Sequence, residues 1–128
     1  MKTVLIVDDE PAIVQLVRIT LETARVRVIE AADGATAIDR AVSHHPDLIL
    51  LDVDLPDLSG LDVCRRLKGE EAMAQTKIVM LTAAAQQDDI ARGFAAGADQ
   101  YLTKPFSPLR LLTLVEQLAP ATDPWQPA

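Results

Sequence analysis

Disulfide bonds are the first feature that the sequence excludes, because its 128 residues contain a single cysteine, Cys64. One cysteine cannot form an internal disulfide, and disulfides are typical of oxidising compartments. The scarcity of cysteine fits a reducing compartment, so we expect a cytoplasmic protein. We interpret Cys64 itself as a small apolar core residue rather than as a nucleophile.

Long apolar runs are also absent. The N-terminal run Val4–Val7 ends on Asp8 and Asp9, which makes it too short for the apolar segment of a signal peptide. No run approaches the roughly 20 apolar residues that a membrane-spanning helix needs. We therefore expect no membrane segment, and a composition of 49% hydrophobic and 24% charged residues fits an ordinary globular domain.

Basic residues are outnumbered in this chain. Lys and Arg total 12 against 19 Asp and Glu, which gives a formal net charge of −7. Proteins that hold nucleic acid through its phosphate backbone depend on clustered Lys and Arg. The acidic balance argues against direct nucleic-acid binding by this chain, although it does not exclude DNA binding by a further domain.

The sequence does contain five short runs that predict strands. Three are continuous, as in strands buried on both faces of a parallel sheet, a fourth partly alternates, as nearer an edge, and the last is weaker. The three continuous runs are Val4–Val7, Leu48–Leu51 and Ile78–Leu81. The partly alternating run is Val26–Ala31, and the weaker run is Asp99–Leu102.

Between these runs, apolar residues recur at helical spacing. The expected buried faces are Ile13, Leu16, Val17, Thr20 and Leu21; Ala35, Ile38, Ala41 and Val42; Leu61, Cys64 and Leu67; Ile90, Ala91 and Phe94; and Leu111, Leu112, Val115 and Leu118. Strands that alternate with helices predict parallel pairing with right-handed crossovers. We expect a doubly wound α/β domain of five parallel strands and five helices over residues 1–119, followed at 120–128 by a Pro-rich tail or the start of a linker.

Polar side chains stand at the carboxyl ends of four of the expected strands. Asp8 and Asp9 follow the first strand, Asp52 ends the third, Thr82 ends the fourth and Lys104 follows the fifth. A single aspartate in such a place is most often a turn residue or a helix cap. Because ligands of doubly wound sheets bind at this edge, the joint pattern favours one crevice that contains all these groups.

The chemistry of such a crevice follows from its charge. Three neighbouring carboxylates repel one another, and a hard divalent cation with oxygen ligands relieves the repulsion. Mg²⁺ is the usual choice where phosphate is handled, and Mn²⁺ could substitute. A carboxylate can also attack phosphorus to form an aspartyl phosphate. Lys104 and Thr82 would then bind the phosphoryl oxygens.

Four segments of the sequence resemble the receiver domains of bacterial response regulators. They are residues 4–11, 46–56, 81–83 and 97–106, and the resemblance extends from residue 2 to about residue 118. It implies a flavodoxin-like fold with strand order 2-1-3-4-5. It also implies a phosphoprotein of two-component signalling, in which a phosphorelay acts through an aspartyl phosphate.

The resemblance implies a role for each acid of the site. Asp52 matches the phosphoacceptor and also contributes to the metal site. Asp9 matches a direct ligand of the magnesium ion, Asp8 a ligand through water, and the backbone carbonyl of Asp54 the third protein ligand.

The resemblance also implies roles for residues of the last two strands. Lys104 matches the phosphoryl-binding lysine, and Lys104–Pro105 matches a cis peptide bond of the family. Thr82 and Tyr101 match the switch pair, in which the hydroxyl moves toward the phosphoryl group and the aromatic ring turns inward.

Two further positions are expected to modulate the lifetime of the phosphoryl group. Asp54 is predicted to face the mouth of the site and to affect dephosphorylation by repelling or orienting water, and a solvated loop acid is an equally good interpretation. Ala84 is small and is expected not to shield the phosphoryl group.

A protein of this kind is a switch and not an enzyme with a separate substrate, since it catalyses only its own phosphorylation and dephosphorylation. The resemblance implies a histidine kinase or phosphotransfer protein as donor. It also implies an output domain or protein that binds the face of the fourth helix, fifth strand and fifth helix. A phosphorylation-dependent homodimer is left open. Leu114 stands where DNA-binding members commonly have Arg, which is weak evidence against their usual dimer.

Two alternatives remain. The triplet Asp52-Val53-Asp54 fits a phosphatase of the haloacid dehalogenase type, but the other acid pair precedes it here, and 128 residues leave no room for a cap over the substrate. A phosphorylation-independent interaction module would need a degraded acidic site, and none of the core positions is lost.

Overall fold

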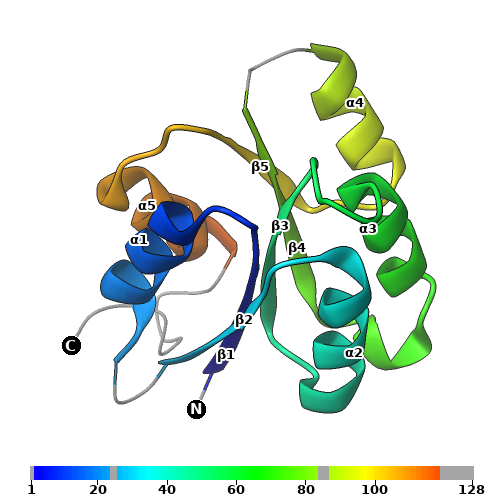
Figure 1. Ribbon diagram of the computed structural model, residues 1–128, viewed down its shortest axis with the longest axis horizontal. Coiled ribbons are helices and arrows are strands. Elements are labelled where there is room, and N and C mark those ends of the chain that lie inside the picture. Colours follow the sequence, from blue (N-terminus) through cyan, green and yellow to red (C-terminus); the bar gives the residue numbers. More distant parts are fainter. Residues whose placement is uncertain (1, 24–25, 84–86, 119–128) are drawn as a thin grey trace.

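A computed structural model describes residues 2–23, 26–83 and 87–118 of the chain (Figure 1). The strands are β1 (Lys2–Val7), β2 (Val26–Ala31), β3 (Leu48–Asp52), β4 (Lys77–Thr82) and β5 (Gln100–Thr103). The helices are α1 (Pro11–Leu21), α2 (Gly34–His44), α3 (Gly60–Lys68), α4 (Gln87–Ala95) and α5 (Pro108–Leu118), with a short 3-10 turn, η1 (Glu71–Met73), between α3 and β4. Ala84 and the proposed tail at 120–128 lie outside the described residues.

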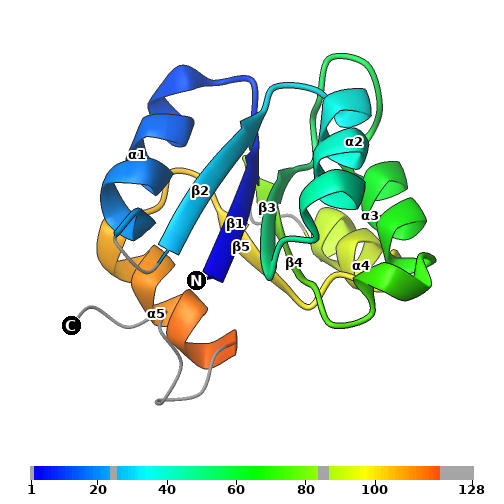
Figure 2. The same ribbon diagram turned by 90° about the horizontal axis from the view of Figure 1, so that it is seen from below.

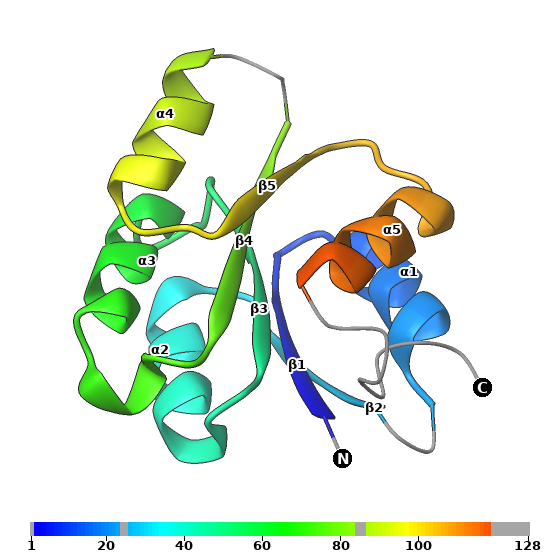
Figure 3. The same ribbon diagram turned by 180° about the vertical axis from the view of Figure 1, so that it is seen from behind.

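The strands form a single parallel sheet in the order β2-β1-β3-β4-β5. Helices α1 and α5 lie side by side on one face, and α2, α3 and α4 cover the other (Figures 1 and 2). The view from behind shows the same two layers of helices (Figure 3). The predicted doubly wound fold is confirmed, and β2 lies at an edge, as its partly alternating sequence indicates.

The core consists of two apolar layers, one on each face of the sheet. Alternate residues of the central strands enter opposite layers, so Val4 and Ile6 pack toward α1 and α5 while Leu5 and Val7 pack toward α2 and α3. All four are completely buried. Burial on both faces explains why β1, β3 and β4 are apolar without alternation.

The predicted buried faces of two helices are partly wrong. On α2, Ala35 and Val42 are exposed, and the buried positions are Gly34, Ala37 and Ala41. The small residues pack against the sheet because they allow close approach, and their low hydrophobicity hides that face in the sequence pattern. On α4, Ala91 and Phe94 are likewise exposed, Phe94 by 46%.

Position 114 has a structural explanation. Leu114 is only 5% exposed and belongs to the apolar layer beneath α5. Burial therefore explains why position 114 holds a leucine and not the arginine that DNA-binding members commonly have.

Among the described helices, none is long and apolar enough to span a bilayer.

Candidate functional site

Two buried aspartates lie side by side at the carboxyl ends of the central strands. Asp52 is the last residue of β3, and Asp8 directly follows β1, the strand that pairs with β3. Their exposed fractions are only 5% and 2%. Two carboxylates in such a place need a compensating cation or protons, because burial disfavours the charged form.

Lys104 supplies positive charge to these acids. Its ammonium nitrogen lies 2.8 Å from Asp8 Oδ2, 3.2 Å from Asp52 Oδ2 and 3.1 Å from Glu10 Oε1. The backbone amide of Lys104 donates to the carbonyl of Thr82 at 2.7 Å, which fixes the start of the loop after β5 against β4. The following bond, Lys104–Pro105, is cis, as the resemblance implies.

The acids nearest to one another are not all those that the sequence singles out. Among the described residues, Asp8, Glu10 and Asp52 bring carboxylate oxygens within 4.8 Å of one another. Asp9 does not belong to this set and is exposed. Sequence reasoning missed Glu10, although its place directly after the acid pair and before the helix-starting Pro11 was an available signal.

The cluster shifts two ionisation equilibria. Burial, together with the nearby charge of Asp8, raises the pKa of Asp52 to about 6, although the Asp54 amide and Lys104 act in the opposite direction. Burial by itself would lower the pKa of Lys104, but its hydrogen bond to Asp8 and the charge of Asp52 more than offset this and raise it. One lysine is therefore held firmly charged among acids that it does not fully neutralise.

The donor set fits a hard divalent cation. Asp8 Oδ2 is buried, and its close partner is the Lys104 ammonium at 2.8 Å, which Asp52 and Glu10 share. Three carboxylates within 4.8 Å offer further oxygens. Oxygen-only donors of this charge suit Mg²⁺ or Mn²⁺ better than softer metals.

The loop between β3 and α3 borders the same site. The backbone amide of Asp54 donates to Asp52 Oδ1 at 3.2 Å, and Asp54 forms an isolated antiparallel bridge with Ser59. The chain then passes so close to the end of β3 that a Cβ on Gly60 would lie 2.0 Å from the carbonyl oxygen of Asp52. The Asp54 side chain is exposed.

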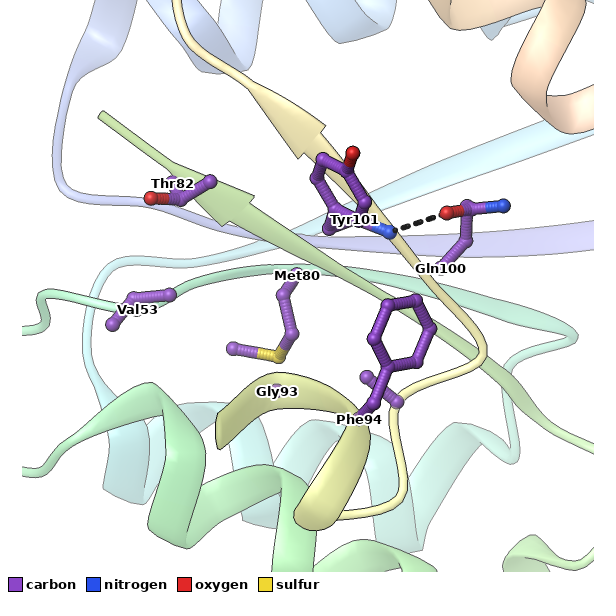
Figure 4. Close-up of a pocket in the computed structure, with 8 residues that line it drawn as sticks. Val53, Met80, Thr82, Gly93, Phe94, Gln100 and Tyr101 are labelled. Carbon is purple, nitrogen blue, oxygen red and sulfur yellow. Dashed lines mark hydrogen bonds between the residues drawn. The ribbon is translucent and has the colours of Figure 1, made fainter. Parts of the chain in front are cut away.

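Thr82 and Tyr101 extend the site toward α4. Figure 4 shows them on the neighbouring strands β4 and β5, beside a narrow hollow that Met80, Gly93 and Phe94 also line. The rings of Phe94 and Tyr101 meet edge to face, with centroids 6.1 Å apart and planes at 88°. The described side chains around the hollow leave no water-sized space inside it.

The structure thus brings Asp8, Asp52, Lys104 and Thr82 to one edge of the sheet, with Tyr101 nearby on β5. Their chemical roles stay predictions. Ala84 lies outside the described residues. A parallel sheet in this order, with an acidic crevice at the carboxyl ends of its central strands, defines a flavodoxin-like domain with its site at the topological switch point.

Residues 4–116 match the response regulator receiver domain family. The chain belongs to this family, whose members act as signalling switches in two-component systems.

Individual relatives agree with this assignment. The DNA-binding dual master transcriptional regulator RpaA of Synechocystis is 46% identical over 123 residues, which are 96% of this chain and 51% of that protein. The chain therefore spans about half the length of this curated relative.

Solved structures show the same fold. The chemotaxis response regulator CheY4 of Vibrio cholerae has a TM-score of 0.86 at 35% identity, covering 92% of this chain and 98% of that chain. The receiver domain of the sensor histidine kinase PA1611 from Pseudomonas aeruginosa has a TM-score of 0.82 at 32% identity, with coverage of 91% and 96%. That structure contains a magnesium ion coordinated in the active site cleft.

Proposed function

We propose that this chain is a phosphorylation switch whose acceptor is Asp52. The observation that carries the proposal is that the nearly buried Asp52 carboxylate contacts the Lys104 ammonium and lies within 4.8 Å of an oxygen of a second buried acid, Asp8. Asp52 is the last residue of β3, and we expect a donor to approach its oxygens from this edge of the sheet. Its neighbours are of the types that hold phosphoryl oxygens and a cation.

In the transfer step, an Asp52 carboxylate oxygen attacks the phosphorus of a phosphohistidine. The new bond is an acyl phosphate, the phosphorus–nitrogen bond breaks, and its electron pair returns to the imidazole of the donor. Lys104 then leaves its carboxylate partners in part to pair with a phosphoryl oxygen, since its ammonium lies only 3.2 Å from Asp52. Thr82 donates a hydrogen bond to another phosphoryl oxygen.

Asp8, Asp9, Asp52 and the Asp54 carbonyl would hold a magnesium ion, with Asp9 as direct ligand and Asp8 acting through water. A bound Mg²⁺ supplies charge neutralisation for the phosphoryl oxygens. The buried Asp8 carboxylate supports a cation here, because it shares the single Lys104 ammonium with Asp52 and Glu10. Glu10, which shares the cluster, adds negative charge that favours the cation.

Movement of the Thr82 and Tyr101 side chains would link phosphorylation of the site to a change at its surface. When Thr82 moves toward the phosphoryl group, the Tyr101 ring turns inward. Because the described side chains leave no water-sized space in the hollow beside them, we expect the ring to enter it when Thr82 or α4 shifts. A local charge change is thereby converted into a rearrangement of the face formed by α4, β5 and α5.

Dephosphorylation is the hydrolysis of the acyl phosphate. A water oxygen attacks phosphorus, the bond between phosphorus and the Asp52 oxygen breaks, and inorganic phosphate, a proton and the free Asp52 carboxylate are released. The exposed side chain of Asp54 stands beside this path, and we expect it to repel or orient the water. The rate of phosphoryl loss from Asp54→Asn tests this role, and an unchanged rate would leave Asp54 a solvated loop acid.

The partners follow from the same chemistry. The donor is a histidine kinase or a phosphotransfer protein, and the output is a domain or protein that recognises the α4, β5 and α5 face. The relative RpaA is a transcriptional regulator, which favours an output in gene control. The single buried Cys64 fits a reducing compartment, and we place the switch in the cytoplasm.

The first test is intact mass after incubation with acetyl phosphate, with and without Mg²⁺. We expect the native chain to gain one phosphoryl group only with Mg²⁺, and Asp52→Ala to gain none. The matched control is Asp62→Ala, which removes an exposed acid from α3 and should be phosphorylated normally. No gain by the native chain in any condition would contradict the proposal, and steady turnover of a phosphate ester would favour a phosphatase.

A further inference from the structure

Asp57, an acid outside the proposed site, links the β3–α3 loop to the start of α2. Asp57, in the loop between β3 and α3, accepts hydrogen bonds from the first two amides of α2: Gly34 N–H at 2.7 Å through Oδ1 and Ala35 N–H at 3.0 Å through Oδ2. Both carboxylate oxygens are used, and these amides hold the pKa of Asp57 below its ordinary value. The two partners come from elements that are separate in sequence.

The same junction is closely packed. A Cβ on Gly34 would lie 2.9 Å from Leu58 Cβ and 3.0 Å from its Cδ1. The absence of a side chain at Gly34 therefore lets the tip of the loop sit directly on the start of α2. Polar and apolar contacts fix the loop tip at the same place.

The base of this loop is part of the acidic site. Asp54, three residues before Asp57, donates its amide to the phosphoacceptor carboxylate, and its bridge to Ser59 closes the loop. The segment from Asp54 to Ser59 is thus held at its base by the bridge and at its tip by Asp57. Movement of the tip would be transmitted to Asp54 over a short length of chain.

We propose that Asp57 is a positioning residue for the metal site, which holds the β3–α3 loop on α2 and so fixes the backbone of Asp54 beside Asp52. The inference rests on the proposed function, in which the Asp54 carbonyl is a metal ligand. Partners that orient metal ligands without touching the metal commonly affect its affinity strongly. Asp57 acts on a backbone ligand in this way.

The experiment compares Asp57→Ala with Asp33→Ala in the full chain. Asp33 caps the same helix by accepting from Thr36 N–H at 2.7 Å. Both variants remove one negative charge and one helix-capping carboxylate from the start of α2. Among these contacts, only Asp57 joins the helix to the β3–α3 loop, so the pair separates loop positioning from charge and capping.

The probe is Mn²⁺, whose binding is followed by electron paramagnetic resonance. We expect Asp57→Ala to weaken Mn²⁺ binding by about tenfold, Asp57→Asn, which keeps one acceptor oxygen, to weaken it less, and Asp33→Ala to change it least. Hydrogen exchange of the Asp54 amide, measured without metal, should accelerate in Asp57→Ala and stay near the native rate in Asp33→Ala. A loss of general stability would affect both variants alike.

Equal Mn²⁺ affinities and equal Asp54 exchange in Asp57→Ala and Asp33→Ala would overturn the inference and leave the proposed function intact. If instead the native chain binds no Mn²⁺, the proposed metal site itself fails. The exchange measurement still judges the loop-holding role of Asp57 in that case, so the two failures remain distinguishable.

Discussion

Two charge clusters lie at opposite ends of the same sheet, one partly buried and one largely buried, and both pair a lysine with aspartate. At the amino ends of β4 and β5, Lys68 donates to Asp99 Oδ2 at 2.8 Å and to the carbonyl of Thr76 at 2.9 Å. Asp99 Oδ2 also accepts from the Ile78 amide at 2.8 Å. One cation meets one anion, and the backbone supplies the remaining partners.

The cluster at the carboxyl ends is built differently. There a single lysine, Lys104, serves the carboxylates of Asp8, Glu10 and Asp52. The excess of negative charge raises the pKa of Asp52, which burial has already raised. The balanced cluster is suited to holding strands in place, whereas the excess negative charge of the unbalanced cluster favours binding of a cation or a proton.

Breaking the balanced cluster should cause the largest loss of stability. Lys68→Met keeps an aliphatic stem beneath Gly97, which Lys68 carbons approach closely, but leaves Asp99 without its cation. We expect a loss of about 2 to 3 kcal/mol in the free energy of unfolding, because a partly buried charge loses its partner.

The measurement for Lys68→Met is urea denaturation with and without Mg²⁺, and exposed Lys77→Met is the control of equal charge change. Mg²⁺ should not restore the lost stability, since this cluster lies away from the proposed metal site. Restoration by Mg²⁺ would show that the two clusters are coupled and would end the distinction between them.

Removing a charge from the unbalanced cluster should have the opposite sign. Asp52→Asn is expected to stabilise the metal-free protein by about 3 kcal/mol at pH 7, since the rise of the Asp52 pKa from 3.8 to about 6 is worth about 1.4 kcal/mol for each unit. Folding raises the pKa of Asp52 from an ordinary value of 3.8 to about 6. Its ionisation therefore costs stability as the pH rises through 6.

The pH dependence checks that sign. Unfolding of native chain and Asp52→Asn should coincide below the ordinary pKa of 3.8, where the carboxyl is protonated in both states. The advantage of the variant should then grow with pH and level off above about 6. An advantage that is constant with pH would mean that packing, not ionisation, distinguishes the two proteins.

Removing the cation of the unbalanced cluster gives an intermediate effect that metal should reverse. Lys104→Met leaves the acids without their ammonium, and we expect a loss of about 1 to 2 kcal/mol, moderated because Asp52 can take up a proton. Mg²⁺ should recover that stability and bind more tightly than in the native chain, as it no longer competes with a lysine. Urea denaturation with and without Mg²⁺ measures the recovered stability, and calorimetric titration measures the Mg²⁺ affinity. Weaker Mg²⁺ binding would contradict the competition.

Much of this architecture was readable from the sequence, for identifiable reasons. The continuous runs Val4–Val7 and Leu48–Leu51 are strands because burial on both faces leaves no room for polar residues. The sequence predicts that Asp8, Asp52 and Lys104 lie close together, and the structure places them so, because parallel topology alone brings the strand ends to one edge. The buried face of α2 was partly missed because Gly34 and Ala37 carry a weak hydrophobic signal.

The missed participants are those whose partners are remote in sequence. Glu10 meets Lys104 across 94 positions, and Asp57 meets Gly34 across 23. Neither contact follows from periodicity or from strand topology, since both depend on how far a side chain reaches between elements. The sequence predicts Asp9 as part of the acid pair, whereas the cluster of neighbouring carboxylates among the described residues contains Glu10 in its place. The ligand role of Asp9 stays a prediction.

Glu10 therefore gives the smallest and most discriminating test of where the unbalanced cluster ends. Its side chain is 59% exposed although its carboxylate lies 3.1 Å from Lys104, and water screens such a contact. We expect Glu10→Gln to change the free energy of unfolding by less than about 0.5 kcal/mol, with even that difference vanishing at high salt. Urea denaturation at low and high salt measures it. A loss comparable with that of Lys104→Met, or a loss that salt leaves unchanged, would show that Glu10 behaves as a buried charge. Three acids, and not only Asp8 and Asp52, would then compete for the charge of Lys104.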